Sequence, residues 1–88
     1  MIRRRVVVRG TVQGVGFRYA CRREASQRHV DGWVTNRSDG AVEAVFEGDS
    51  AEVEAMVAWA RSGPSQARVT DLEVGEEQPE GESGFQVR

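Results

Sequence analysis

The chain has 88 residues, 39% of them hydrophobic, and a formal net charge of −2 at pH 7, so we expect one soluble domain spanning residues 1–88. The acidic balance argues against general binding to nucleic acid or to an anionic membrane. No apolar run approaches the roughly 20 residues of a membrane helix. No signal peptide is recognisable either, so we expect a cytoplasmic location. A single cysteine, Cys21, and the absence of lysine exclude an intrachain disulfide, a CxxC metal site and a P-loop lysine.

The first half of the chain predicts a strand, a loop, a helix and a second strand. Residues 5–9 contain three consecutive valines and are typical of a strand. A glycine-rich loop follows. From residue 17 to about residue 28 we expect a helix, because small and apolar residues recur at helical spacing: Phe17, Ala20, Cys21 and Ala25. Residues 30–36 then predict a second strand.

The second half begins with a turn at Asp39-Gly40. In residues 42–47, apolar residues alternate with glutamates, which predicts a third strand with one face in the core. Asp49 as N-cap, with Glu52 three positions on, predicts a capping box for a second helix. The apolar stripe of that helix is Val53, Met56, Val57 and Ala60, with Trp59 beside it.

A glycine and a proline at positions 63 and 64 are expected to end the second helix. Residues 69–74 predict a fourth strand, residues 75–82 an acidic loop and residues 85–87 a short terminal strand. The order β-α-β-β-α-β is that of the ferredoxin-like α/β (α+β) sandwich, here with an added short C-terminal strand. We therefore expect a mostly antiparallel sheet with two helices on one face. This topology serves many activities and does not by itself give a function.

The loop after the first strand has the composition of an anion site. Gly10, Gly14 and Gly16 give the backbone the freedom to turn successive N–H groups inward. The loop runs into a helix N-terminus, whose dipole favours an anion, and Arg18 lies in the first turn with a planar fork suited to phosphate. The alternative, a plain tight turn followed by a surface arginine, stays open on spacing alone. The loop matches neither GxxxxGK[ST] nor GxGxxG.

Few other residues are candidates for catalysis. His29 is the only histidine, and its place at the end of the first helix favours a capping or surface role over a catalytic one. No cluster of residues has the spacing of metal ligands. Asn36 is the only asparagine and ends the second predicted strand before a turn. Taken alone, a turn-forming asparagine is the more common reading.

The sequence resembles the acylphosphatases over essentially its whole length. The family pattern V-R-G-x-V-Q-G-V-x-F-R is matched from Val8 to Arg18, the pattern G-W-V-x-N from Gly32 to Asn36, and the pattern D-G-x-V-E from Asp39 to Glu43. The Gly63-Pro64 helix end and the closing Gly84-Phe85 also fit. Where family members usually have Leu-Gly before the G-W-V block, this chain has Arg28-His29, and we expect His29 to take the left-handed conformation of that glycine at some cost.

The resemblance implies a hydrolase that cleaves small-molecule acyl phosphates to a carboxylate and inorganic phosphate, without a metal or cofactor. Arg18 matches the family's phosphate-binding arginine, and Asn36 matches the asparagine that orients the attacking water, which reverses the reading of Asn36 taken alone. The phosphate-binding loop corresponds to Gln13, Gly14, Val15, Gly16, Phe17 and Arg18. Nothing in the sequence specifies the acyl group.

Two other classes remain as alternatives at this point. One is an acylphosphatase-like module that binds phosphate without catalysis, which the presence of both Arg18 and Asn36 disfavours. The other is an RNA-binding domain of the same topology, which needs exposed aromatic residues on the open sheet face. Trp33 and Phe46 are expected in the core, and the acidic balance also opposes that use. We expect a monomer.

Overall fold

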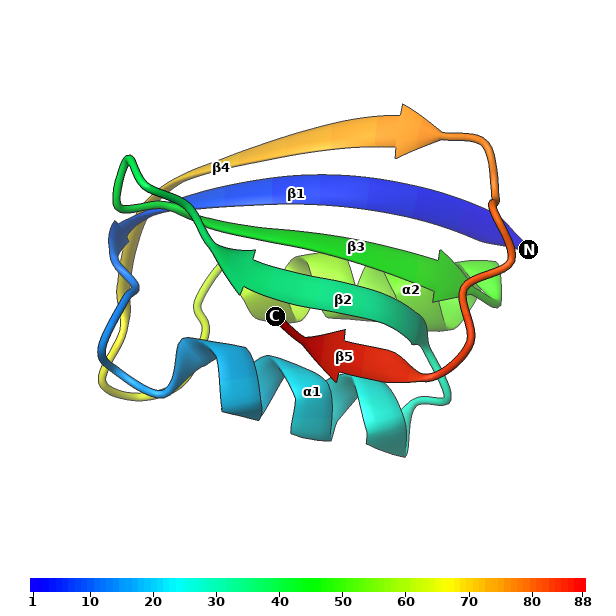
Figure 1. The fold of residues 1–88 in the computed structure, drawn as a ribbon, viewed down its shortest axis with the longest axis horizontal. Coiled ribbons are helices and arrows are strands. Elements are labelled where there is room, and N and C mark those ends of the chain that lie inside the picture. Colours follow the sequence, from blue (N-terminus) through cyan, green and yellow to red (C-terminus); the bar gives the residue numbers. More distant parts are fainter.

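The computed structural model describes all residues from Met1 to Arg88. Seven elements follow one another along the chain (Figure 1). In chain order they are β1 (Ile2–Thr11), α1 (Phe17–Gln27), β2 (Asp31–Asn36), β3 (Val42–Gly48), α2 (Ser50–Ala60), β4 (Arg68–Glu77) and β5 (Phe85–Val87).

The strands form one sheet in the order β4-β1-β3-β2-β5. Neighbouring strands are antiparallel, except that β5 runs parallel to β2. Both helices cover the same face of the sheet (Figure 1). The predicted ferredoxin-like fold with an added C-terminal strand is therefore confirmed. Each helix has 11 residues, and neither is long and apolar enough to cross a membrane.

The core lies between the sheet and the two helices. The predicted apolar faces of α1 and α2 are both buried, that of α1 against β2 and β5 and that of α2 against β1 and β3, which confirms the helical spacing on which they rest. The cluster comprises Val6, Val8, Val12, Phe17, Cys21, Ala25, Val30, Val34, Val42, Ala44, Phe46, Val53, Met56, Val57 and Ala60. The ring of Phe17 also packs against that of Trp59, with 5.3 Å between centroids, so the start of α1 is anchored on α2.

Strands β1 and β4 extend well beyond their predicted limits. Pairing between them begins at Arg3 and Glu77, so residues 75–77, expected in an acidic loop, belong to β4. Opposite charges across two strands stabilise a sheet, and Arg5 forms an ion pair with Glu77 across this one. Taken separately, the arginines at the start of β1 and the glutamates at the end of β4 do not predict a strand. Each set of charges favours a strand only because the other set lies opposite to it in the sheet.

The alternation in β3 predicts that Glu47 faces solvent, and this prediction is wrong. Its side chain is 1% exposed and meets that of Arg3, which is 2% exposed, with 3.1 Å between Nη1 and Oε2. The main-chain N–H groups of Glu80, Gly81 and Glu82 also donate to the Glu47 carboxylate. The chain between β4 and β5 therefore folds over this end of the sheet and buries the pair, which alternation along β3 alone does not show.

These carboxylates make stability depend on pH. Burial by itself raises the pKa of Glu47, but the main-chain donors of residues 80–82 and Arg3 outweigh it, so the pKa lies below its ordinary value of 4.5. Arg5 and then Arg3 likewise lower the pKa of Glu77. As the pH falls below about 5, the unfolded chain takes up protons on these groups before the folded protein does, and the free energy of unfolding decreases.

We expect Glu47→Gln to lower the free energy of unfolding at neutral pH by about 3–5 kcal/mol, because one carboxylate oxygen becomes an NH2 group that cannot accept the hydrogen bonds made there, and buried Arg3 loses the charge of its partner. The urea midpoint of this variant should also fall less steeply on acidification than that of the wild type. Urea titrations from neutral pH into the acid range test both points. Glu76→Gln, at an exposed β4 position, is the control, and a slope for Glu47→Gln that matches the wild type contradicts the account.

The end of α1 confirms the expectation for His29, which has a φ of 56°. Its N–H donates to Ser26 O, and that of Val30 to Ala25 O, at 3.3 and 2.9 Å. These are the two bonds of a Schellman motif, which usually has glycine at the position of His29. His29→Gly is expected to raise the free energy of unfolding by about 0.5–1 kcal/mol, the left-handed strain less the added freedom of the unfolded chain. Thermal unfolding measures this effect, and an unchanged or lower midpoint contradicts it.

The expected capping box at the start of α2 is wrong. Asp49 occupies the N-cap position, but no side-chain hydrogen bond caps the helix. Glu52 instead accepts a hydrogen bond from Arg28, at 3.2 Å. A charged partner on α1 therefore replaces the local bond, which sequence spacing within α2 does not reveal.

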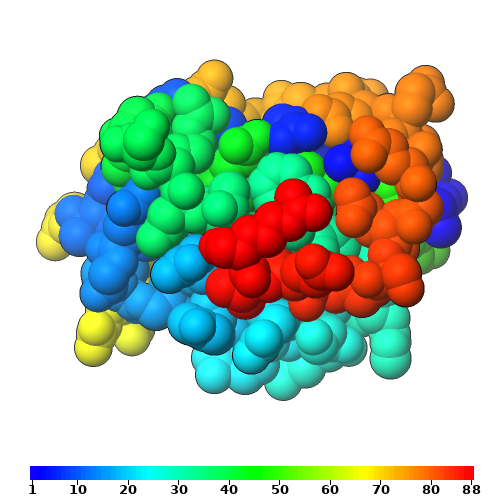
Figure 2. Space-filling view, in the orientation of Figure 1, coloured from blue at the N-terminus to red at the C-terminus, as the bar shows by residue number.

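The open face of the sheet is covered by charged side chains. Trp33, expected in the core, lies on this face and is 9% exposed, because the guanidinium groups of Arg5 and Arg88 lie over its ring at 5.4 and 4.6 Å from the centroid. Figure 2 shows the C-terminal segment, in red, lying across the molecule above α1. No exposed aromatic residue is left on this face, so nothing in the structure favours RNA binding.

Candidate active site

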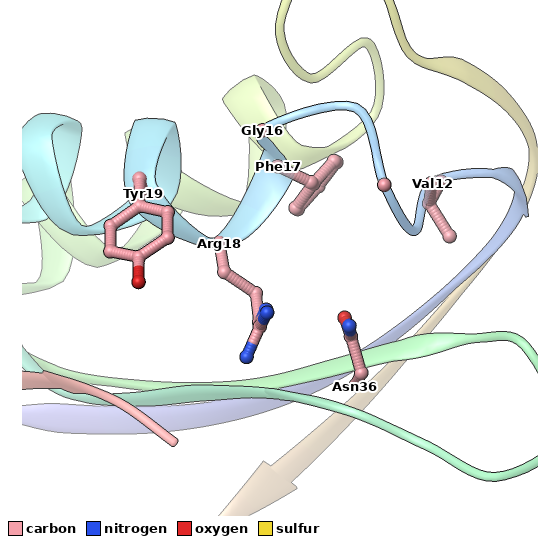
Figure 3. Close-up of a pocket in the computed structure, with 7 residues that line it drawn as sticks. Val12, Gly16, Phe17, Arg18, Tyr19 and Asn36 are labelled. Atoms are coloured by element: carbon pink, nitrogen blue, oxygen red, sulfur yellow. The ribbon is translucent and has the colours of Figure 1, made fainter.

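A cavity of about 210 Å³ opens where the loop after β1 faces the end of β2. Figure 3 shows the side chains of Arg18 and Asn36 pointing into it from α1 and β2. Of the residues expected from sequence, Gly14, Gly16, Phe17, Arg18 and Asn36 line it, whereas Gln13 and Val15 do not. Val12 and Tyr19 line it in addition. The fold thus brings together two residues that are eighteen positions apart in the sequence.

The loop presents main-chain N–H groups without partners. Gly14 and Gly16 have φ angles of 76° and 79°, a left-handed conformation that favours glycine. Gly16 is the N-cap of α1 and no side chain caps the helix. The first bond within the helix runs from Ala20 N to Gly16 O, and the N–H groups of residues 14–16 donate to no main-chain oxygen. An anion is the natural ligand for such an N-terminus.

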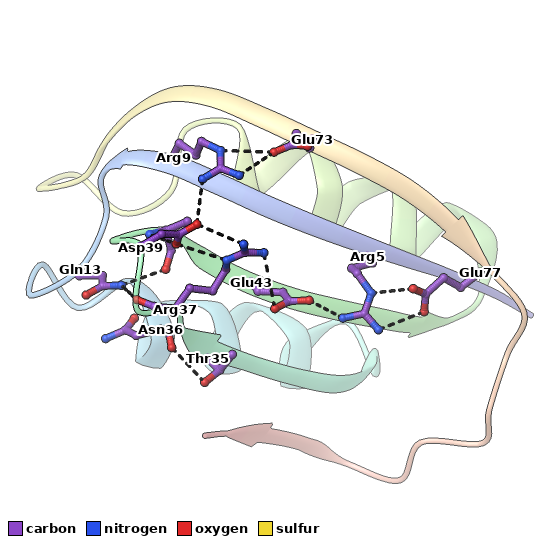
Figure 4. Close-up of polar contacts among 11 residues, drawn as sticks. Arg5, Arg9, Gln13, Thr35, Asn36, Arg37, Asp39, Glu43, Glu73 and Glu77 are labelled. Carbon is purple, nitrogen blue, oxygen red and sulfur yellow. Dashed lines mark hydrogen bonds and ion pairs between the residues drawn. The ribbon is translucent and has the colours of Figure 1, made fainter.

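Arg18 is the one charged residue that lines the cavity. Its Nη1 donates to the main-chain oxygen of Arg88 at 2.9 Å, which leaves the other N–H groups of the guanidinium available. Other arginines near this end of the sheet are already paired with carboxylates: Arg9 with Glu73 and Asp39, and Arg37 with Asp39 (Figure 4). Arg18 forms no ion pair with an aspartate or glutamate side chain, so most of its N–H groups are available to a bound anion.

The side chain of Gln13 has a role that sequence reasoning missed. Its Nε2 donates to Arg37 O and Ala41 O at 2.8 and 2.9 Å, which ties the loop to the hairpin between β2 and β3 (Figure 4). In that hairpin the N–H of Ala41 and the guanidinium groups of Arg37 and Arg9 lower the pKa of Asp39 to about 2. Gln13 therefore holds the two halves of the site in register, a function that only the tertiary pairing reveals.

Asn36 is the last residue of β2, opposite Val42 of β3. Its Oδ1 is buried and has no hydrogen-bond partner. A buried polar atom without a partner is costly and rare in folded proteins, and this one belongs to a side chain aimed into the cavity (Figure 3). Oδ1 is therefore placed to accept a hydrogen bond from a molecule that enters the site.

Comparison with known proteins shows the family to which the chain belongs. The family model described as Acylphosphatase matches residues 4–87. The chain belongs to the acylphosphatase family. It is 54% identical to an acylphosphatase of Thermococcus kodakarensis and 54% identical to one of Haloarcula marismortui, each over 98% of this chain and 94% of the relative. It is also similar to the crystal structure of acylphosphatase from Bacillus subtilis, with a TM-score of 0.96 and 40% identity over 100% of this chain and 99% of that one.

The resemblance seen in the sequence is thus confirmed, and with it acylphosphatase activity, a hydrolase activity. Similarity to curated acylphosphatases over nearly the full chain does not favour a module that binds phosphate without catalysis.

Other reactive side chains of this acylphosphatase lie outside the cavity. His29 is exposed beyond the far end of α1, a helix of 11 residues that is about 16 Å long. Cys21 is buried in the core, and this burial raises the pKa of its thiol, so the thiol stays protonated. No group of three or more histidine, cysteine, aspartate or glutamate side chains is arranged to hold a metal ion.

Proposed function

We propose that the chain hydrolyses small acyl phosphates with the loop and Arg18 holding the phosphoryl group and Asn36 holding the water. The N–H groups of residues 13–18 and the guanidinium of Arg18 bind the phosphoryl oxygens. Water donates a hydrogen bond to Asn36 Oδ1 and directs a lone pair at phosphorus. The new P–O bond forms as the bond from phosphorus to the carboxyl oxygen breaks, which gives a carboxylate and inorganic phosphate.

The observation that carries this proposal is the pair of unsatisfied groups on opposite walls of one cavity. Arg18 pairs with no aspartate or glutamate side chain, and Asn36 Oδ1 has no hydrogen-bond donor. A phosphoryl group can accept from the free N–H groups of Arg18, and a water molecule can donate to Asn36 Oδ1. Fixed donors that surround the phosphoryl group stabilise developing charge without reorganising, and a water held in line with the scissile bond gains from proximity and orientation.

The reaction needs no strong base in the site. The amide of Asn36 does not take up a proton at neutral pH, and no carboxylate or histidine lines the cavity. The leaving group is a carboxylate, which departs readily without a proton. We assign the proton of the attacking water to a phosphoryl oxygen, so the phosphate leaves with it.

The same proposal includes metal- and cofactor-independent catalysis, a monomer and a cytoplasmic location. The loop N–H groups and Arg18 bind the phosphoryl oxygens and offset their charge, as a metal ion does in other phosphoryl-transfer sites. The cavity draws on a single chain, since α1 and β2 supply both candidate catalytic side chains.

Phosphate release from acetyl phosphate by the purified protein, with and without EDTA, tests the proposal. We expect equal rates in both conditions. A rate lost on chelation and restored by metal contradicts the metal-independent mechanism. Binding of inorganic phosphate without any release from acetyl phosphate contradicts hydrolysis and supports the module that only binds.

A further inference from the structure

Tyr19 is the feature of the cavity that neither the phosphate nor the water explains. It follows Arg18 in the first turn of α1 and lines the same cavity. Its side chain is 60% exposed, and it is one of three large hydrophobic residues on the surface, with Met1 and Val74. An exposed aromatic ring on the wall of a ligand cavity is a common contact for an organic ligand.

The size of the cavity shows which part of a substrate reaches Tyr19. Its volume of about 210 Å³ is below the roughly 300–1,000 Å³ of pockets that enclose drug-sized ligands. The phosphoryl group lies against the loop and Arg18 and takes up part of this volume. A large acyl group therefore reaches the more exposed part of the cavity wall, which includes Tyr19.

In-line displacement gives the direction of that extension. The leaving group departs on the side of phosphorus opposite to the attacking water. In the view of Figure 3, Arg18 lies between Tyr19 and Asn36, which holds the water in the proposed function. An acyl group that departs away from Asn36 therefore extends toward Tyr19 in that view.

The ring of Tyr19 is held in place for such a contact. Arg22, one turn further along α1, places its guanidinium 5.5 Å from the ring centroid, which favours one orientation of the ring. Tyr19 lies on a helix, whose backbone is more rigid than that of a loop. A tyrosine also loses little side-chain freedom on binding.

We propose that Tyr19 is a specificity-determining residue that contacts the acyl group and favours flat, apolar acyl phosphates such as aromatic ones. The proposal rests on the assignment of water to Asn36 and of phosphate to Arg18. It gives the active site an acyl-group preference that its phosphate-binding parts do not supply.

The kinetic test compares benzoyl phosphate with acetyl phosphate in Tyr19→Ala and Tyr19→Phe. Tyr19→Ala should raise KM for benzoyl phosphate about fivefold to tenfold, which is the value of one aromatic contact. A contact made equally before and during reaction changes KM and leaves kcat unaltered. KM for acetyl phosphate and inhibition by inorganic phosphate should stay unchanged. Tyr19→Phe should behave as the wild type, and so should Val74→Ala, an exposed apolar residue away from the cavity.

A second measurement separates this inference from the proposed function. The affinities of benzylphosphonate and methylphosphonate, measured by calorimetry, need no turnover. Tyr19→Ala should weaken only the benzyl compound, by a similar factor. An equal effect on both compounds, or none, overturns the role of Tyr19. Failure of the wild type to hydrolyse acetyl phosphate contradicts the proposed function instead, and the phosphonate pair still decides on Tyr19.

Discussion

Arg18→Ala is expected to lower kcat/KM for acetyl phosphate by about a thousandfold or more, since it removes a charged pair of donors from a preorganised oxyanion site. Inhibition by inorganic phosphate should be lost as well, because Arg18 is the only charged residue that lines the cavity. The fold should survive, since the one hydrogen bond of this side chain is an exposed contact with Arg88 O. Steady-state kinetics and phosphate inhibition measure the effect.

Arg18→Lys separates charge from geometry. Lysine keeps the positive charge but offers a point charge in place of a planar fork, so we expect it to recover only a small part of the lost activity. Arg23→Ala, an exposed arginine on the same helix, is the control for a general change in charge. Phosphate inhibition that persists in Arg18→Ala would show that the loop N–H groups bind the anion alone.

Much of the fold follows from local patterns. The helical spacing of Phe17, Cys21 and Ala25 and the valines of β1 describe one buried face each, and such faces permit few arrangements. The errors share one cause. Glu47 is buried by the distant chain at residues 80–82, and Glu52 is drawn to Arg28. Sequence patterns report each residue's own preference, whereas these charges are placed by partners elsewhere in the chain.

The residues of the site also differ in how far the sequence alone predicts them. Glycines and an arginine in the loop indicate an anion, because the chemistry lies within one segment. Asn36 has no local signature that distinguishes it from a turn residue, and only the family resemblance assigned it a role. The side chain of Gln13 and the ring of Tyr19 gave no signal, since the meaning of each depends on what lies across the cavity. The roles of both residues can be recognised only in the folded structure, where β2 and α1 face each other.

Asn36→Ala is expected to lower kcat by about a hundredfold to a thousandfold, the usual range for loss of one well-placed polar group in an active site, while inhibition by inorganic phosphate stays close to that of the wild type. Asn36 Oδ1 has no partner within the protein, so its removal breaks no internal hydrogen bond and stability should hold. The phosphate site on the loop and Arg18 is left complete. The effect thus falls on turnover and leaves phosphate binding in place.

Asn36→Asp tests whether position or charge matters at this point. Aspartate keeps an oxygen that accepts from water but brings a negative charge next to the phosphoryl group, so we expect phosphate inhibition to weaken as the carboxylate ionises. Turnover by Asn36→Ala at the wild-type rate would show that Asn36 does not hold the attacking water. The loop, Arg18 and the phosphoryl group itself would then have to orient the nucleophile.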